Sequence, residues 1–221
     1  MIEIRQIQKK YKKNTVLKNV NLTVSEGSCV GILGSNGCGK STLLSVLAGV
    51  QKADSGSFLW EGADLFCNEK QRSLLLGYVP QGNPLMEELT AWDNLRLWYG
   101  KKELCRELEE GVLAMLGIPD FVKIPVRKMS GGMKKRLSIG CAAANNPRIL
   151  LLDEPSASLD LVCKERIGNY LKEFCSRGGI VLLATHDVQE LEFCSSWHIL
   201  KEGVLTPYEY DGNVHHLVGR L

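Results

Sequence analysis

The hydrophobic residues of this chain follow two patterns, which predict two kinds of β-strand. In the first, apolar and polar positions alternate, as in a strand with one buried face. Residues 2–7 (IEIRQI) alternate in this way, and residues 16–24 (VLKNVNLTV) do so roughly. In the second, a short apolar run is continuous, as in a strand buried on both faces. Such runs occur in residues 28–34 (SCVGILG), 148–155 (RILLLDEP) and 180–187 (IVLLATHD).

Helical periodicity separates these runs. Segments 41–49 and 161–178 each end on a glycine, which is a common helix stop. Segment 102–117 is predicted as a helix because apolar residues recur there at helical spacing, at Leu104, Leu108, Val112 and Met115. We interpret this stripe as ordinary core packing. Asp187 and Glu190 have the spacing of a capping box, which predicts the start of one more helix.

Buried strands that alternate with helices indicate an α/β protein with a parallel sheet. Segments 56–60 and 74–81 are predicted as further strands. The antiparallel-looking start and the helix-rich middle are expected to be additions to this parallel core.

Composition narrows the functional classes. The chain has 221 residues, 27 basic and 25 acidic side chains and a net charge of +2, which gives no reason to expect nucleic-acid binding. Its eight cysteines contain no C-x-x-C pair and no secretory signal is visible, so we expect reduced thiols in the cytoplasm. The longest apolar runs are far shorter than the roughly 20 residues that span a bilayer. Any role at a membrane is therefore expected to depend on a partner.

A glycine-rich segment after the strand at 28–34 matches the phosphate-loop pattern G-x-x-x-x-G-K-[ST]. Its residues are Gly34, Ser35, Asn36, Gly37, Cys38, Gly39, Lys40 and Ser41, with Thr42 next. In this context backbone N–H groups surround phosphate oxygens, Lys40 reaches the β- and γ-phosphates, and the Ser41 hydroxyl binds Mg²⁺. We interpret Cys38 as a filler position. A chance glycine-rich turn is the alternative, and the flanking strand and helix count against it.

Polar residues lie at the ends of two of the buried runs and of the strand predicted at 74–81. Asp153 suits a magnesium contact, and Glu154 suits the orientation or deprotonation of an attacking water. His186 ends another buried run, so we expect it to sense the γ-phosphate. Gln81 could reach a metal or water, although alone it resembles any surface-loop glutamine.

A second glycine-rich helix start, Ser130-Gly131-Gly132, lies in the stretch RKMSGGMKKRLSIG (127–140). A helix N-terminus with free N–H groups is suited to phosphate. The cations that follow, Lys134, Lys135 and Arg136, are predicted to form a solvated helix face.

Together these motifs resemble the ATP-binding subunit of ATP-binding-cassette (ABC) transporters over nearly the whole chain. In this resemblance GSNGCGKS is the Walker A loop and ILLLDE is Walker B with its catalytic glutamate. Gln81 corresponds to the Q-loop, Ser158-Leu159-Asp160 to the D-loop and His186 to the switch histidine. Tyr11 corresponds to an aromatic residue that stacks on adenine, with a core tyrosine as the alternative.

Ser130, Gly131 and Gly132 resemble the centre of the family signature LSGGQ. Met129 and Met133 stand where leucine and glutamine are usual. The first exchange is nearly isosteric, whereas the second removes an amide. The resemblance implies that two subunits meet head to tail, so that each ATP lies between one chain's Walker A loop and the other chain's signature residues.

The resemblance further implies a P-loop NTPase core with an N-terminal antiparallel β subdomain and an inserted helical subdomain. The core would occupy about residues 1–80 and 147–221 of a single domain, and the helical insert about 82–146. ATP and Mg²⁺ are the implied ligands. The implied partners are a second ABC ATPase subunit, identical or different, and separate polytopic permease subunits that hold the chain at the inner face of the cell membrane.

The overall likeness to stand-alone multidrug or ABC-2-type subunits favours export. Two alternatives stay open: a soluble ABC ATPase that acts on DNA or ribosomes, and a regulatory nucleotide-binding module without turnover. Near-neutral charge counts against the first alternative. The set Lys40, Asp153, Glu154 and His186 counts against the second.

Overall fold

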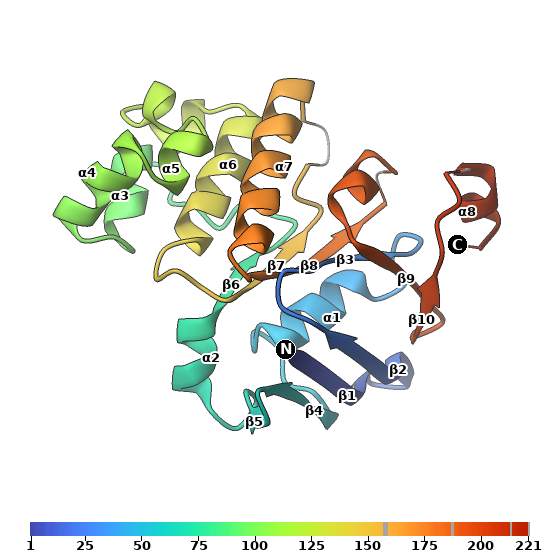
Figure 1. Ribbon diagram of the computed structural model, residues 1–221. Coiled ribbons are helices and arrows are strands. Elements are labelled where there is room, and N and C mark those ends of the chain that lie inside the picture. The colour runs from blue at the N-terminus through green and yellow to red at the C-terminus, as the bar shows by residue number, and fades with distance from the viewer. Residues whose placement is uncertain (157–158, 187, 213, 221) are drawn as a thin grey trace.

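A computed structural model describes residues 1–156, 159–186, 188–212 and 214–220 of the chain. A helical layer covers one face of a six-stranded sheet, and a four-stranded antiparallel sheet with helix α1 lies on the other side (Figure 1). This arrangement confirms the predicted α/β class, including the antiparallel start and the helix-rich middle.

The six-stranded sheet has the strand order β10-β9-β3-β8-β7-β6. Its members are β3 (Cys29–Leu33), β6 (Leu76–Val79), β7 (Ile149–Asp153), β8 (Ile180–Thr185), β9 (Ser196–Lys201) and β10 (Val204–Tyr208). Pairing is parallel from β6 to β9, and only β10 is antiparallel to its neighbour within this sheet. The three continuous apolar runs therefore form the three central strands.

Both faces of the central strands are buried. In β7, Leu150 and Leu152 pack into the core beneath the helical layer, whereas Ile149 and Leu151 pack into the core shared with the antiparallel sheet. Successive side chains of a strand point to opposite faces, so a strand between two cores must be apolar at every position. This requirement explains why these runs are continuous.

The antiparallel sheet has the order β2-β1-β4-β5, built from β1 (Ile2–Tyr11), β2 (Asn14–Val24), β4 (Ser55–Trp60) and β5 (Ala63–Asp64). Helix α1 (Lys40–Leu47) packs between this sheet and the central strands, and contributes Leu43, Leu44, Val46 and Leu47 to their common core. The helix that follows the phosphate loop is therefore held on both sides.

The helical layer consists of α3 (Ala91–Arg96), α4 (Lys101–Glu109), α5 (Val112–Met115), α6 (Gly131–Ala142) and α7 (Leu161–Ser176), with short 3-10 turns at Pro119–Phe121 and Val126–Lys128. The single helix predicted over 102–117 is wrong, because the structure breaks at Gly111. At the break, Glu107 Oε2 accepts a hydrogen bond from the Val112 N–H at 2.9 Å, which satisfies a backbone donor at the start of α5. The apolar stripe nevertheless packs into the core beneath the helical layer, as predicted.

The strand predicted over 74–81 is too long. Helix α2 (Glu69–Leu75), capped by Asn68, includes Leu74 and Leu75, and pairing with β7 begins only at Leu76. The remaining elements are a 3-10 segment η3 (Val188–Phe193) and α8 (Val214–Arg220). In the part of the chain that the structure describes, no helix is both long enough and apolar enough to cross a membrane.

Candidate nucleotide site

Four of the parallel strands of the six-stranded sheet, β3, β6, β7 and β8, lead at one edge into the predicted site residues. Leu33 of β3 pairs with Thr185 of β8, Asp153 of β7 pairs with Ala184 of β8, and β6 ends at Val79 beside β7. The carboxyl edge of a parallel sheet is where α/β proteins bind ligands. The register thus brings the phosphate loop, Glu154, His186 and Gln81 to one place.

The phosphate loop connects β3 to α1 and is shaped by its glycines. Gly39 has φ of +114°, and a Cβ there would lie 2.9 Å from Val16 Cγ1. A Cβ on Gly34 would lie 2.4 Å from Cys38 Sγ, so Cys38 fills space within the loop, as predicted. Lys40 is buried, and its Nζ donates hydrogen bonds to the carbonyls of Gly34 at 2.7 Å and Ser35 at 3.2 Å. The ammonium therefore lies across the loop.

Asp153 ends β7 inside the protein and is 1% exposed. Burial raises the pKa of its carboxyl group, although a hydrogen bond with the Ser41 side chain acts in the opposite direction. Its Oδ1 atom is buried and lacks a hydrogen-bond partner in the structure. A buried carboxylate oxygen without a partner is costly, so this atom is suited to a cation or a cation-bound water.

Glu154 is held between two side chains that are distant in sequence. Its Oε2 accepts a hydrogen bond from Gln81 Nε2 at 2.9 Å, and its Oε1 lies 2.8 Å from His186 Nδ1. Its backbone has φ of +48°, outside the usual range for this residue type, and its N–H donates to the Ala184 carbonyl. The β7–β8 pairing therefore fixes the backbone, while Gln81 and His186 orient the carboxylate.

Glu190 belongs to this region, although the sequence pattern assigned it a different role. The capping box predicted for it requires Asp187, which lies outside the described residues. Glu190 is 1% exposed, and its Oε1 accepts a hydrogen bond from the Ser156 N–H at 2.8 Å. It thus ties the segment after His186 to the segment after Glu154. No local pattern could reveal a contact between residues 34 positions apart.

The second glycine-rich segment begins helix α6, as predicted. Ser130 is the N-cap, and its Oγ accepts a hydrogen bond from the Met133 N–H at 3.2 Å. Ser130 and Gly131 are exposed, while a Cβ on Gly132 would come within 2.8 Å of Cys163 Sγ on α7. The first turn of α6 therefore presents backbone to the solvent and packs closely against α7.

The prediction of a solvated face at Lys134, Lys135 and Arg136 is wrong for two of the three residues. Lys135 and Arg136 are 5% and 9% exposed. Arg136 Nη1 donates to the Leu116 carbonyl, and its guanidinium group lies 4.9 Å from the centre of the Phe121 ring. Burial is possible because each charged group finds partners: carbonyls of the loop after β6 for Lys135, and a carbonyl and an aromatic ring of the helical layer for Arg136.

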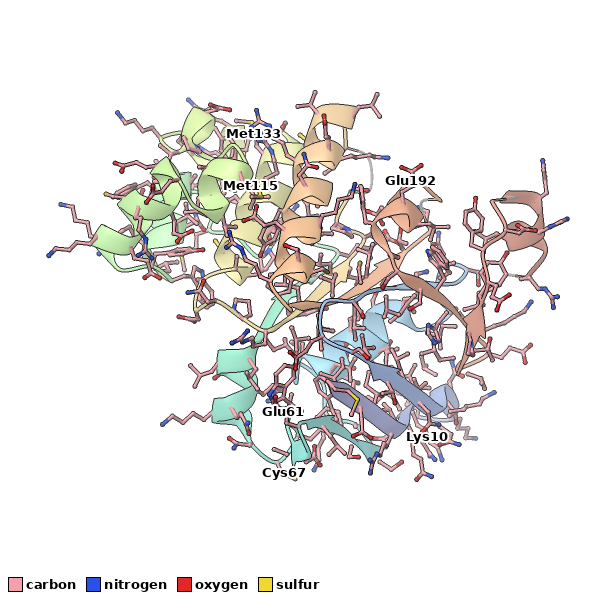
Figure 2. The ribbon with its side chains drawn as sticks, in the orientation of Figure 1. Lys10, Glu61, Cys67, Met115, Met133 and Glu192 are labelled. Carbon is pink, nitrogen blue, oxygen red and sulfur yellow. The ribbon has the colours of Figure 1, made fainter. Side chains whose placement is uncertain are left out.

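The side chains of the two signature methionines, Met129 and Met133, pack against the core beneath the helical layer. Figure 2 shows Met133 in the helical layer, at the opposite end of the molecule from Glu61 and Cys67 of the antiparallel-sheet side. Because Ser130 already bonds the Met133 N–H, the helix cap does not depend on an amide side chain at this position.

Asp160 is the N-cap of α7, where its Oδ1 accepts a hydrogen bond from the Cys163 N–H at 2.8 Å. This bond lowers the pKa of the Asp160 carboxyl group. Ser158, the first residue of the predicted D-loop, lies outside the described residues.

Tyr11 ends β1 and is 43% exposed, so the alternative of a core tyrosine is wrong. Its hydroxyl group donates a hydrogen bond to Gln51 Oε1, and Lys9 Nζ lies 5.4 Å from the ring centre. The ring is therefore anchored at its hydroxyl end while part of its surface faces solvent.

The described residues contain no group of three or more His, Cys, Asp or Glu side chains arranged to hold a metal ion. A magnesium ion at Asp153 would thus need the Ser41 hydroxyl group, phosphate oxygens and water, which is its usual coordination in nucleotide sites.

Comparison with known proteins assigns the chain to a protein family. Residues 17–157 match the family model described as ABC transporter. The chain belongs to the ABC transporter family. The ABC match covers the phosphate loop, the signature segment and the strand that ends at Asp153.

Curated ABC relatives are similar along most of their length. The chain is 30% identical over 215 residues to the lantibiotic transport ATP-binding protein SrtF of Streptococcus pyogenes, covering 96% of this chain and 93% of SrtF. It is 32% identical over 208 residues to the linearmycin resistance ATP-binding protein LnrL of Bacillus subtilis, covering 92% of this chain and 67% of LnrL.

A solved structure agrees with the sequence matches. The dimeric bacterial ABC transporter cassette MJ0796 has a TM-score of 0.84 at 30% identity, covering 95% of this chain and all of the cassette. The same cassette has also been solved as a dimer in a post-hydrolysis state with ADP and Pi. These findings confirm the P-loop NTPase fold, and the chain is an ABC ATPase that binds adenine nucleotide.

Proposed function

We propose that this chain hydrolyses ATP as one half of a dimer and drives export through separate membrane permease subunits. The observation that carries the proposal is the position of Glu154. Its carboxylate is held by Gln81 and His186 at the sheet edge from which the phosphate loop also begins. Such convergence of a base, its orienting partners and a phosphate loop favours turnover over binding alone.

Within one chain, residues Gly34 to Thr42 bind the phosphates of ATP. The loop N–H groups surround the phosphate oxygens, and Lys40 exchanges its Gly34 and Ser35 carbonyl acceptors for β- and γ-phosphate oxygens. Tyr11 stacks on the adenine through the part of its ring that is exposed.

Ser41, Gln81 and Asp153 hold Mg²⁺ together with the phosphate oxygens. The unpartnered Oδ1 of Asp153 supports this assignment, because the atom is buried without a hydrogen-bond donor. Bound magnesium neutralises charge that develops on the phosphates.

Glu154 is the general base. It takes a proton from water while the water oxygen forms a bond to the γ-phosphorus and the bond to the β-phosphate oxygen breaks, which yields ADP and phosphate. Gln81 and His186 bond one carboxylate oxygen each, so the side chain keeps its direction and each oxygen retains a lone pair for the water. His186 also senses the γ-phosphate, since its ring is exposed beside Glu154.

The dimer supplies the remaining ligands of each ATP. Ser130, Gly131 and Gly132 of one chain contact the γ-phosphate bound by the other, with Asp160 nearby at the start of α7. Exposure of Ser130 and Gly131 at a helix N-terminus supports this role, because that end carries partial positive charge and free N–H groups. The dimeric MJ0796 cassette supports a dimer. The second subunit is a copy of this chain or a different ABC ATPase.

The permease docks in a groove between the core and the helical layer. This groove has a volume of about 350 Å³ and lies between β6 and helices α3 and α6. Its lining includes four large apolar side chains that are more than half exposed: Leu74, Met86, Leu97 and Trp98. Such a patch on a monomer is typical of an interaction site. The groove also includes Pro84, three residues after Gln81, so a docked permease contacts the loop that orients Glu154.

This docking holds the chain at the cytoplasmic face of the membrane. The proposed function requires no nucleic-acid partner. The export direction rests on names of relatives, which include lantibiotic transport, Nod factor export and linearmycin resistance proteins. A spermidine/putrescine import ATP-binding protein of Spiroplasma citri is also similar.

The direct test is phosphate release by Glu154→Gln, with Glu192→Gln as the matched control. Glu192 is exposed on η3 (Figure 2), is not among the described contacts of Glu154, and undergoes the same chemical change. We expect kcat to fall by at least ~10² for Glu154→Gln from loss of the base, with ATP-bound dimers accumulating, and no change for Glu192→Gln. Near-normal hydrolysis by Glu154→Gln would refute its assignment.

A second test separates transport from the soluble alternatives. After detergent extraction, the chain should co-purify with a polytopic membrane protein, and Trp98→Glu should weaken that association by placing a charge in the apolar groove. Recovery with ribosomes or DNA instead would favour a soluble ABC ATPase. Absence of phosphate release by the wild type would favour a non-hydrolysing regulatory module.

A further inference from the structure

Lys135 makes a contact that its sequence position does not suggest. It lies in α6, a little more than one turn after Ser130, and its side chain crosses to the loop after β6. Its Nζ donates hydrogen bonds to the carbonyl oxygens of Pro80 at 3.2 Å and Gln81 at 3.1 Å. The residue is 5% exposed, so this contact is shielded from water.

We propose that Lys135 is a positioning residue for hydrolysis: it holds the backbone of Gln81, whose side chain holds Glu154, and thereby connects the start of α6 to the catalytic carboxylate. The chain of contacts is continuous, from Lys135 Nζ to the Gln81 carbonyl and from Gln81 Nε2 to Glu154 Oε2. This inference rests on the proposed roles of Glu154 and of the α6 N-terminus.

The electrostatic surroundings fix the lysine in this position. Burial lowers the pKa of the Lys135 ammonium group, while the nearby carboxylates of Asp153, Glu190 and Glu154 raise it. These carboxylates come from the end of β7, the segment after it and η3. If the ammonium group moved, it would lose both carbonyl acceptors, and no other described contact of Lys135 would replace these hydrogen bonds. A buried ammonium group without acceptors is costly, so the side chain is held in this position.

The adjacent Lys134 shows what an ordinary surface lysine does on the same helix. Its Nζ lies 2.8 Å from Glu87 Oε1, and this pair is partly solvated, with side-chain exposures of 22% and 54%. Solvent-exposed ion pairs of this kind contribute little to the stability of the folded protein. Two successive lysines of equal length and charge therefore differ in burial and partner, which makes one a matched control for the other.

In the proposed dimer, the contact between Lys135 and the Gln81 loop would connect the two ATP sites. The start of α6 contacts ATP bound by the partner chain, whereas Gln81 and Glu154 serve the ATP of their own chain. Lys135 then connects the two ATP sites through about one turn of helix, two carbonyls and one amide side chain. A shift of α6 when the partner binds ATP would move the Gln81 backbone and with it the carboxylate. Hydrolysis at one site is thus expected to depend on occupancy of the other.

The test compares Lys135→Met with Lys134→Met, each of which removes an ammonium group and keeps an unbranched side chain. We expect kcat of Lys135→Met to fall by roughly 10-fold or more, because small displacements of positioning groups are costly. KM for ATP should stay within about twofold, since the phosphate loop is untouched. The Hill coefficient for ATP should fall to about 1. Lys134→Met should match the wild type in all three quantities.

Hydrogen exchange provides a local readout. In Lys135→Met, amides of the loop after Val79 should exchange faster, while those of β7 should keep their protection. If Lys135→Met does not fold, Lys135→Gln, which keeps a polar group but does not reach the carbonyls, carries the same expectations. Wild-type kcat and Hill coefficient in a folded variant at position 135 would overturn the inference. So would a higher KM with unchanged kcat.

The two proposals fail in different ways. If Glu154→Gln hydrolyses ATP like the wild type, the assignment of the base is wrong whatever position 135 does. If Glu154→Gln is inactive and still dimerises with ATP, but Lys135→Met behaves like Lys134→Met, only the role of Lys135 is wrong.

Discussion

Replacement of Asp153 by asparagine should stabilise the protein in the absence of nucleotide while it weakens stabilisation by MgATP. The carboxylate is 1% exposed, and its Oδ1 has no hydrogen-bond partner. An asparagine of the same shape removes the buried charge and keeps a carbonyl oxygen that can accept the hydrogen bond from Ser41. The native residue is therefore expected to cost stability in exchange for its role at the metal.

The size of the effect follows from the surroundings of the carboxylate. A neutral polar group that is buried without a partner costs about 1–3 kcal/mol and a charged one costs more, so the asparagine removes only the excess that is due to charge. The Ser41 hydrogen bond and the charges of Lys40 and Lys135 offset part of this cost. We expect a net gain in the free energy of unfolding of about 1 kcal/mol for Asp153→Asn, which corresponds to a Tm increase of about 2–4 °C for a chain of this size.

The gain should depend on pH in a defined direction. Burial raises the pKa of the Asp153 carboxyl group above 3.8, so the folded state binds this proton more tightly than the unfolded state. Stability then falls as pH rises from 3.8 through the raised pKa, and the full penalty is present above that value. The Tm difference between Asp153→Asn and the wild type should be largest at neutral pH and should shrink as pH falls towards 4.

Thermal unfolding between pH 4 and 8, with and without MgATP, measures these effects. Asp120→Asn is the control, because the Asp120 side chain is 71% exposed. MgATP should raise the Tm of the wild type and of Asp120→Asn, and should raise that of Asp153→Asn much less. A lower Tm for nucleotide-free Asp153→Asn at pH 7, or a Tm difference that does not change with pH, would refute the reasoning.

Two further predictions concern the two halves of the ATP site. Ser130→Arg should leave ATP binding by the single chain largely intact but abolish ATP-driven dimerisation and turnover, because a bulky cation replaces the helix cap at the subunit contact. Ser176→Arg, at the exposed far end of α7, is the control. If size-exclusion chromatography with ATP shows that Ser130→Arg still dimerises, the site shared between two chains is refuted. Tyr11→Ala should raise the Kd for ATP by about 5- to 10-fold through loss of ~1 kcal/mol of stacking, with Tyr11→Phe near the wild type. Equal affinities for both Tyr11 variants would exclude adenine stacking.

Local sequence was sufficient for much of the fold and for the phosphate loop. The apolar runs at 28–34, 148–155 and 180–187 could be recognised as central strands, because a strand between two cores must be apolar on both faces. The loop at 34–41 could be recognised because its chemistry depends on neighbouring residues. The helix boundaries near Gly111 and Leu75 were less predictable, since a hydrogen bond between the Glu107 side chain and the backbone accompanies the first and pairing with β7 the second.

Tertiary structure decided what the charged residues do. Lys134, Lys135 and Arg136 are adjacent and similar in sequence, yet one is a surface ion pair, one bonds the Gln81 loop and one packs on Phe121. Periodicity describes the faces of a helix, but it does not specify which carbonyls or carboxylates lie opposite a given face. The same limit applies to Glu154, because Gln81 and His186 reach its carboxylate only when parallel strands bring their carboxyl ends together. The sequence by itself determined the elements and the phosphate chemistry, whereas the partners of each buried charge depended on contacts between segments distant in the chain.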